Sequence, residues 1–199
     1  MINLNSDSFK SKQVKVFNNG EAGKVRNVKV SVEKRQPDEP VNRPPYNVFY
    51  EDGTGAKLKQ SWFYFKPKEG ATEEKLARDQ EILIGRLLTL AHSVCGADYQ
   101  FEEARDINHA VDVIMAAIRE NSREALVNIF VTYGNDYRAS KYLEVRFFDF
   151  IESATTPDSG SRLRVKPNDV MVRLTADDDS SQVNQEVSTT SDPFDSNPF

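Results

Sequence analysis

Residues 72–96 of the 199-residue chain, TEEKLARDQEILIGRLLTLAHSVCG, decide how the rest of the sequence is interpreted. Thr72 followed by two glutamates is typical of a helix start. A threonine side chain accepts a hydrogen bond from a free backbone N–H, and acidic residues favour the positive end of the helix dipole. Apolar residues then recur at helical spacing as far as Val94, and Gly96 predicts the end of the helix. A second helix with its own apolar stripe is expected over residues 106–121.

Strand patterns lie on both sides of these helices. Before them, valines alternate with lysine or arginine over residues 13–34, and a hairpin is expected over residues 46–66 around the turn EDGTG. After them, strands are expected over residues 126–133 and 142–152. Three strands, a helical insert and two strands is the order of an OB fold. We therefore expect a mainly β fold (α+β), an OB-like five-stranded Greek-key barrel with its helices between strands 3 and 4. A meandering α+β sheet shares much of this pattern and remains an alternative.

The composition divides the chain into three parts. Residues 1–152 are expected to form the OB-like domain, with the helical insert at about 72–121. Residues 153–174 begin as a linker, SATTPDSGS, and then offer an extra hairpin. Residues 175–199 are acidic and cannot bury enough apolar area to fold, so we expect a disordered tail.

The net charge of −5 hides a strong segregation of charge along the chain. Residues 1–68 hold thirteen Lys/Arg against seven Asp/Glu, whereas residues 175–199 hold six Asp/Glu and no Lys or Arg. Local sign matters more than the total for attracting a polyanion. The plainer alternative is that helices and tails are simply acid-rich.

The expected strand faces predict a single-stranded nucleic-acid site. Aromatic residues interleave with lysine and arginine on faces that the core does not require, so bases can stack on the rings while cations follow the phosphates. The candidate binding residues are Lys24, Arg26, Lys57, Lys59, Trp62, Phe63, Phe65, Tyr137, Arg138, Lys141, Tyr142, Arg146 and Phe148. The alternative is that these rings pack beneath the helices or at the interface of a homo-oligomer.

The C-terminal sequence DPFDSNPF carries the most specific signal. A flexible acidic peptide with a terminal phenylalanine suits a hydrophobic pocket with a basic rim. This ending resembles the acidic tips of bacterial single-stranded DNA-binding proteins and of their phage counterparts. The resemblance implies partner binding through Asp192, Pro193, Phe194, Asp195, Pro198 and Phe199. Its expected partners are replication or recombination proteins such as a polymerase, helicase or primase. An incidental disordered end remains an alternative, and NPF and DPF also resemble endocytic adaptor ligands.

Other function classes lack support in the sequence. We find no Walker A loop, GxSxG, HExxH or cysteine-rich spacing, so we expect neither an enzyme nor a metal or other cofactor. No apolar run approaches the ~20 residues that span a bilayer, and a lone cysteine, Cys95, fits a cytoplasmic protein. The expected function is sequence-nonspecific coating of single-stranded DNA in replication, recombination and repair, in the host cytoplasm if a phage encodes the chain. An annealing or recombination-mediator protein and a phage structural or assembly protein remain alternatives.

Overall fold

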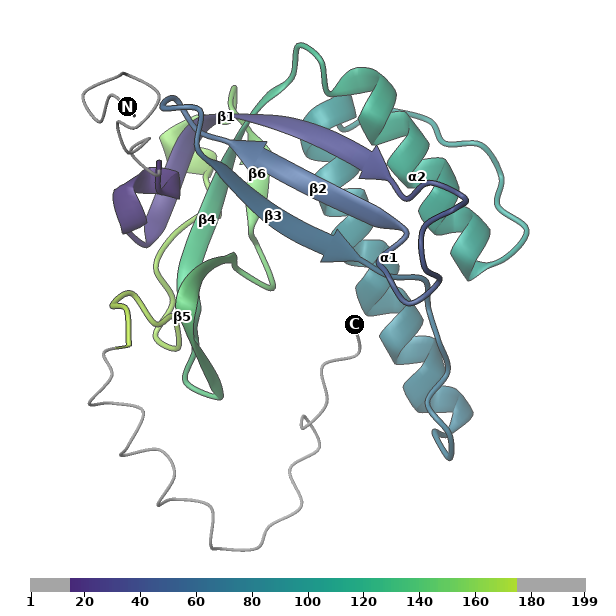
Figure 1. The fold of residues 1–199 in the computed structure, drawn as a ribbon. Coiled ribbons are helices and arrows are strands. Elements are labelled where there is room, and N and C mark those ends of the chain that lie inside the picture. Colours follow the sequence, from purple (N-terminus) through teal and green to yellow (C-terminus); the bar gives the residue numbers. More distant parts are fainter. Residues whose placement is uncertain (1–14, 175–199) are drawn as a thin grey trace, which may run out of the picture.

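The computed structural model describes residues 15–174 and shows a β-rich α+β fold (Figure 1). One antiparallel sheet of six strands is accompanied by two α-helices. The elements are β1 (Gly23–Lys34), β2 (Tyr46–Glu51), β3 (Lys57–Trp62), α1 (Glu73–Cys95), α2 (Ile107–Asn121), β4 (Leu126–Asn135), β5 (Arg138–Val145) and β6 (Ile151–Ser153). The strand order is β3-β2-β1-β4-β5, and β6 pairs with β4. The predicted mainly β, α+β fold with two helices between the third and fourth strands is therefore confirmed, but the sheet has six strands where five were expected.

Both helices begin where the sequence predicts. The Thr72 side chain accepts a hydrogen bond from the backbone N–H of Lys75, and the Asp106 carboxylate accepts two, from the N–H groups of Asn108 and His109. Such caps satisfy backbone donors that have no partner within the helix. Gly96 ends α1 with φ at 99°, a conformation that glycine adopts without steric cost.

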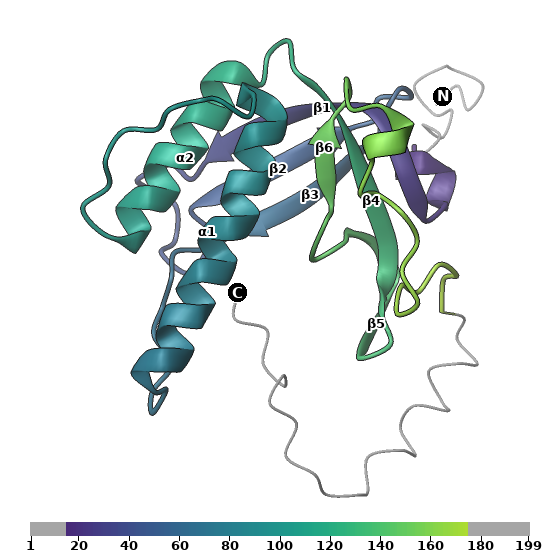
Figure 2. The same cartoon turned by 180° about the vertical axis from the view of Figure 1, so that it is seen from behind.

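The helices cover only one face of the β1–β2–β3 part of the sheet. Figure 1 shows these strands in front of both helices, and Figure 2 shows the helices in front of the strands from behind. The covered face is apolar because alternate residues of each strand point the same way. Its core includes Val28, Val30, Val32, Val48 and Tyr50 of the sheet, packed with Leu83, Leu87, Leu90, Met115 and Ile118 of the helices. Each such leucine contributes roughly 1.5–3 kcal/mol by burial.

Polar contacts fix α2 against the ends of β2 and β3. Oδ1 of Asp112 accepts hydrogen bonds from the hydroxyl of Tyr46 at 2.5 Å and from that of Tyr64 at 2.7 Å. Burial, and then the hydrogen bond to Asp112, raise the pKa of Tyr64 to about 12. Both phenols therefore remain protonated donors at neutral pH, and the helix keeps a fixed register on the sheet.

The sheet remains open where a closed barrel was expected. Cα atoms of β3 and β5 come within 8 Å of each other. Among the described residues, however, no strand pairing joins these two strands. The described structure therefore shows an open sheet and not a closed Greek-key barrel.

The strand expected over residues 142–152 is broken into two. β5 ends at Val145 and β6 begins at Ile151. Asp149 has φ at 47°, which no strand allows, and the side chain of Arg146 turns inward between them. The predicted alternation therefore fails here: Phe150, which a continuous strand would place on the same face as Tyr142, Arg146 and Phe148, is 1% exposed.

Residues 154–174 contain no strand of their own, so the hairpin suggested by the sequence is not formed. The segment folds back along the end of β4 instead. The N–H of Tyr133 donates to the carbonyl of Val170, the N–H of Val170 donates to the carbonyl of Gly134, and Leu163 is buried. This segment is thus part of the folded body.

Candidate nucleic-acid interface

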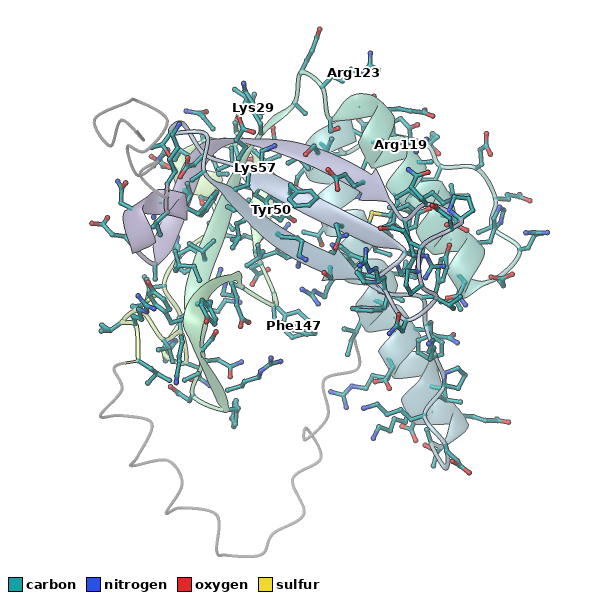
Figure 3. The ribbon with its side chains drawn as sticks, in the orientation of Figure 1. Lys29, Tyr50, Lys57, Arg119, Arg123 and Phe147 are labelled. Atoms are coloured by element: carbon teal, nitrogen blue, oxygen red, sulfur yellow. The ribbon has the colours of Figure 1, made fainter. Side chains whose placement is uncertain are left out.

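The face of the sheet opposite the helices presents lysines in register with one aromatic ring. The β1–β2 and β2–β3 pairings align Lys29, Glu51 and Lys57 in one row across the three strands, and Ser31, Phe49 and Lys59 in the next. We call these six residues the open face. Figure 3 shows Lys29 on β1 and Lys57 on β3, the strands that lie in front of the helices in this view. The arrangement follows from the alternation of residues 28–32 of β1 and of β2, in which every second residue is buried on the helix side.

The charge of the open face is positive. Lys57 forms an ion pair with Glu51 at 3.3 Å, with both side chains partly exposed. Within the part of the chain that the structure describes, Lys29 and Lys59 have no ion-pair partner, and both are exposed. Because an exposed ion pair of this kind contributes little, its glutamate yields readily to a competing anion. The three lysines therefore flank the half-buried Phe49 ring with net positive charge.

The aromatic residues predicted near the end of β3 divide into buried and accessible rings. Trp62 is 3% exposed and belongs to the core, where no base can stack on it. Phe63 follows the end of β3 and is partly exposed. Phe65 packs partly against the core, and its N–H donates to Oδ1 of Asn108 at 2.7 Å. Of these three, Phe63 is the one that is neither buried nor packed against the core cluster.

The β4–β5 hairpin carries the second group of predicted residues. Tyr137 at its tip and Tyr142 on β5 are 80% and 73% exposed, and Arg138 and Lys141 are exposed between them. The turn is tight because Gly134 has φ at 91°, and a Cβ there would lie 2.0 Å from the carbonyl oxygen of Arg138. Figure 1 shows β4 and β5 as an arm that extends from the sheet. Two exposed rings and two exposed cations lie on this arm.

Lys24 and Arg26 are engaged within the protein. Lys24 forms an ion pair with Glu152 at 2.8 Å, and Arg26 donates to both carboxylate oxygens of Asp158. Burial alone would raise the pKa of Glu152, but hydrogen bonds from Lys24 and Ser161 outweigh it and hold the pKa below its usual range. Lys24 and Glu152 are largely covered, so this pair anchors residues 152–161 to β1. The Arg26–Asp158 pair is exposed, and Arg26 therefore stays a candidate phosphate ligand.

Arg146 is also structural, although the sequence places it among the binding residues. It is 6% exposed, forms a buried ion pair with Asp169 at 2.8 Å and lies over the Phe130 ring. Its guanidinium also donates to the carbonyls of Phe148, Asp149 and Arg164. All three guanidinium nitrogens are thus occupied, and no phosphate can reach them. Phe148 itself is 52% exposed.

Two candidate binding residues of the open face, Phe49 and Lys29, were not predicted from the sequence. Phe49 is the only ring among the outward residues of β2, and Lys29 lies opposite Glu51 on β1. The alternation in YNVFYE carried the signal, because Tyr46, Val48 and Tyr50 define the inward face and leave Phe49 outside.

Three further observations concern metal sites, membrane spans and the predicted partner residues. The described residues contain no group of three or more His, Cys, Asp or Glu side chains placed to hold a metal ion. In the same residues no helix is long and apolar enough to cross a membrane. The predicted partner residues Asp192, Pro193, Phe194, Asp195, Pro198 and Phe199 lie outside the described residues.

Comparisons with protein-family models, with curated proteins and with solved structures found no match for this chain.

Proposed function

We propose that this protein binds single-stranded DNA on the open face, without strong sequence preference, and coats the strand during replication, recombination and repair. The observation that carries the proposal is the placement of Phe49 among Lys29, Lys57 and Lys59 on a face that no helix covers. Lysines bind phosphates as point charges, and a base can stack on the ring for roughly 1–3 kcal/mol. Every base has a π face, so this contact discriminates little.

The strand order also supports an OB-like assignment. In an OB fold the first strand pairs with the second and the fourth, and the helix lies between the third and fourth. The order β3-β2-β1-β4-β5 and the position of α1 and α2 agree with that scheme. Strands 2 and 3 and the loop between strands 4 and 5 are the usual contact surfaces of this fold. They correspond here to the open face and to the arm bearing Tyr137 and Tyr142.

The same proposal includes the C-terminal residues. Residues 175–199, with net charge −6 and the motifs DPF and NPF, recruit replication or recombination proteins through Asp192–Phe199. The protein then acts as a non-enzymatic binding protein that links DNA to its processing machinery in the cytoplasm.

The test compares the loss of lysines on the open face with the loss of an exposed lysine on α1. Fluorescence anisotropy of labelled oligo-dT is measured between roughly 50 and 200 mM salt for the wild type, for Lys57→Ala/Lys59→Ala and for Lys75→Ala. Lys75 is an exposed lysine of α1, on the opposite side of the sheet from the open face. The open-face variant is expected to bind more weakly and to lose about 0.7 unit of log–log salt slope per phosphate contact, whereas Lys75→Ala keeps the wild-type slope.

Equal slopes in the two variants would remove these lysines from the interface. If the wild type itself fails to bind oligo-dT at low salt, the proposal is wrong, and a phage structural or assembly role becomes the better account. Strand annealing in solution, together with a ring-shaped oligomer, would instead identify a recombination mediator.

A further inference from the structure

A pocket of about 300 Å³ lies apart from the open face, between α1 and the connection from β5 to β6. The wall from α1 carries Glu81, Gly85 and Arg86, and the wall from the connection carries Phe147, Phe148, Asp149 and Phe150. Figure 3 shows Phe147 between the β4–β5 arm and α1. Phe148 is the exposed ring at the mouth, so the pocket opens beside one of the rings expected to stack on bases.

Arg86 is a partly buried cation, and no hydrogen bond joins its guanidinium to another described residue. Its guanidinium lies 3.9 Å from the centroid of the Phe147 ring and 5.2 Å from that of Trp62. Its Nε and the indole Nε1 of Trp62 are both buried and unpaired. Burial lowers the pKa of Arg86 to about 10, so the group stays charged at neutral pH. The rings stabilise the charge but offer no acceptor, and an unpaired buried donor is costly.

Gly85 makes the α1 wall flat. A glycine inside a helix costs roughly 1 kcal/mol relative to alanine. A Cβ at Gly85 would meet no atom within 4 Å, so packing within the protein does not explain the residue. The space above it belongs to the pocket. A planar ligand can therefore approach the helix backbone at this point.

We propose that this pocket binds one unstacked guanine base of the bound strand. The proposal rests on the proposed function and adds a base-selective subsite to it. Guanine presents two acceptors, O6 and N7, that match a guanidinium in the bidentate manner. Its other edge carries N–H donors that match the carboxylate of Glu81 and the oxygen of Asp149 that is not paired with Lys166. The phenylalanine rings supply stacking surfaces.

Other ligands fit the same groups less well. Adenine and cytosine present an amino donor on the edge that would face Arg86, and thymine offers one acceptor beside a methyl group. A phosphate would meet the carboxylate of Glu81, which forms no ion pair with another described residue, and it would leave the stacking surfaces of the rings unused. Charge and hydrogen-bond complementarity together therefore favour guanine.

The experiment compares two labelled oligonucleotides, twelve thymines and the same strand with one central guanine, on the full-length protein. The wild type is expected to bind the guanine strand at least about fivefold more tightly, because one bidentate contact gives that much discrimination. Replacing guanine by inosine removes the amino donor and is expected to lower this ratio.

Two variants test the pocket itself. Arg86→Met removes the donors while keeping the side-chain volume, and Gly85→Leu fills the space above the helix with a residue that favours helix formation. Both are expected to bring the ratio of affinities close to one. Ala77→Leu adds the same bulk at an exposed position of α1 outside the pocket and is expected to keep the wild-type ratio.

A wild-type ratio of one, with both strands bound, would overturn the guanine site and leave the proposed function standing. A ratio that survives Gly85→Leu would overturn it as well. Failure of the wild type to bind either strand would overturn the proposed function and this inference together.

Discussion

Replacing Arg146 with methionine tests whether this arginine, which the sequence places among the binding residues, instead stabilises the fold. The change removes one member of a buried ion pair whose two side chains are each 6% exposed, together with bonds to three backbone carbonyls. Breaking a buried pair in this way leaves Asp169 without its counter-charge and is expected to cost about 3–5 kcal/mol. At roughly 2–4 °C per kcal/mol for a domain of this size, the melting temperature should fall by about 6–20 °C.

Urea unfolding followed through the fluorescence of Trp62, which is buried, measures this loss. Arg162→Met is the matched control, because Arg162 is an exposed arginine close by in the chain. We expect it to change stability by less than about 0.5 kcal/mol. Removing Asp169 as well, as Asn, should recover part of the loss, because the remaining group is then neutral. A small effect of Arg146→Met on stability, combined with weaker DNA binding and a reduced salt slope, would refute this reasoning and return Arg146 to the interface.

Three further predictions address the open face, acid stability and the C-terminal residues. Phe49→Ala should weaken oligo-dT binding by roughly 1–3 kcal/mol in anisotropy titrations with little change in melting temperature, and early melting would instead assign the ring to the core. The hydrogen bond from Lys166 lowers the pKa of Asp149, so its stabilising effect is complete above the unfolded pKa near 4 and disappears as pH falls through the lower folded value. The free energy of unfolding of Asp149→Asn should therefore depend less steeply on pH below about 4 than that of the wild type. An equally steep dependence in this range would contradict the pairing of Asp149 with Lys166. Deleting residues 175–199 should leave the melting temperature nearly unchanged and tighten DNA binding at low salt, because a tethered polyanion no longer competes, whereas weaker binding after deletion would contradict this role. Removing Phe199 alone should spare DNA binding and abolish pull-down of replication or repair proteins.

The helices were predictable because their signals are local. Thr72 and Asp106 cap their helices through atoms within three residues, and the apolar stripes repeat over many turns. The alternation of β1 was predictable for the same reason, since Val28, Val30 and Val32 lie on one face. Such features depend on neighbouring residues alone.

The break after β5 was not predictable from alternation. The run EVRFFDFI contains rings at both parities, so the pattern fits a continuous strand equally well. The backbone breaks because Asp149 adopts a left-handed conformation and because Arg146 finds its acceptors in residues 148–169. That partnership exists only once the later segment folds back along β4.

The sequence does not show which of the predicted binding residues already have a partner within the protein, because long-range pairing decides this. Lys24 and Arg26 are spaced like phosphate ligands in the sequence, but their partners Glu152 and Asp158 lie more than 120 residues away. Residue type and spacing could identify a basic strand, but they could not show that Lys24 forms a largely covered ion pair with Glu152. Phe49, in contrast, could have been predicted from the alternation of β2 alone.

The most direct test of the central claim is an NMR titration of the full-length protein with oligo-dT. The account predicts that amide shifts concentrate on β1, β2 and β3 around Lys29, Phe49 and Lys59 and on the β4–β5 arm, while the amides of α2 stay in place. Shifts centred on α2, or no shifts at low salt, would contradict the claim that the uncovered face of the sheet binds the strand.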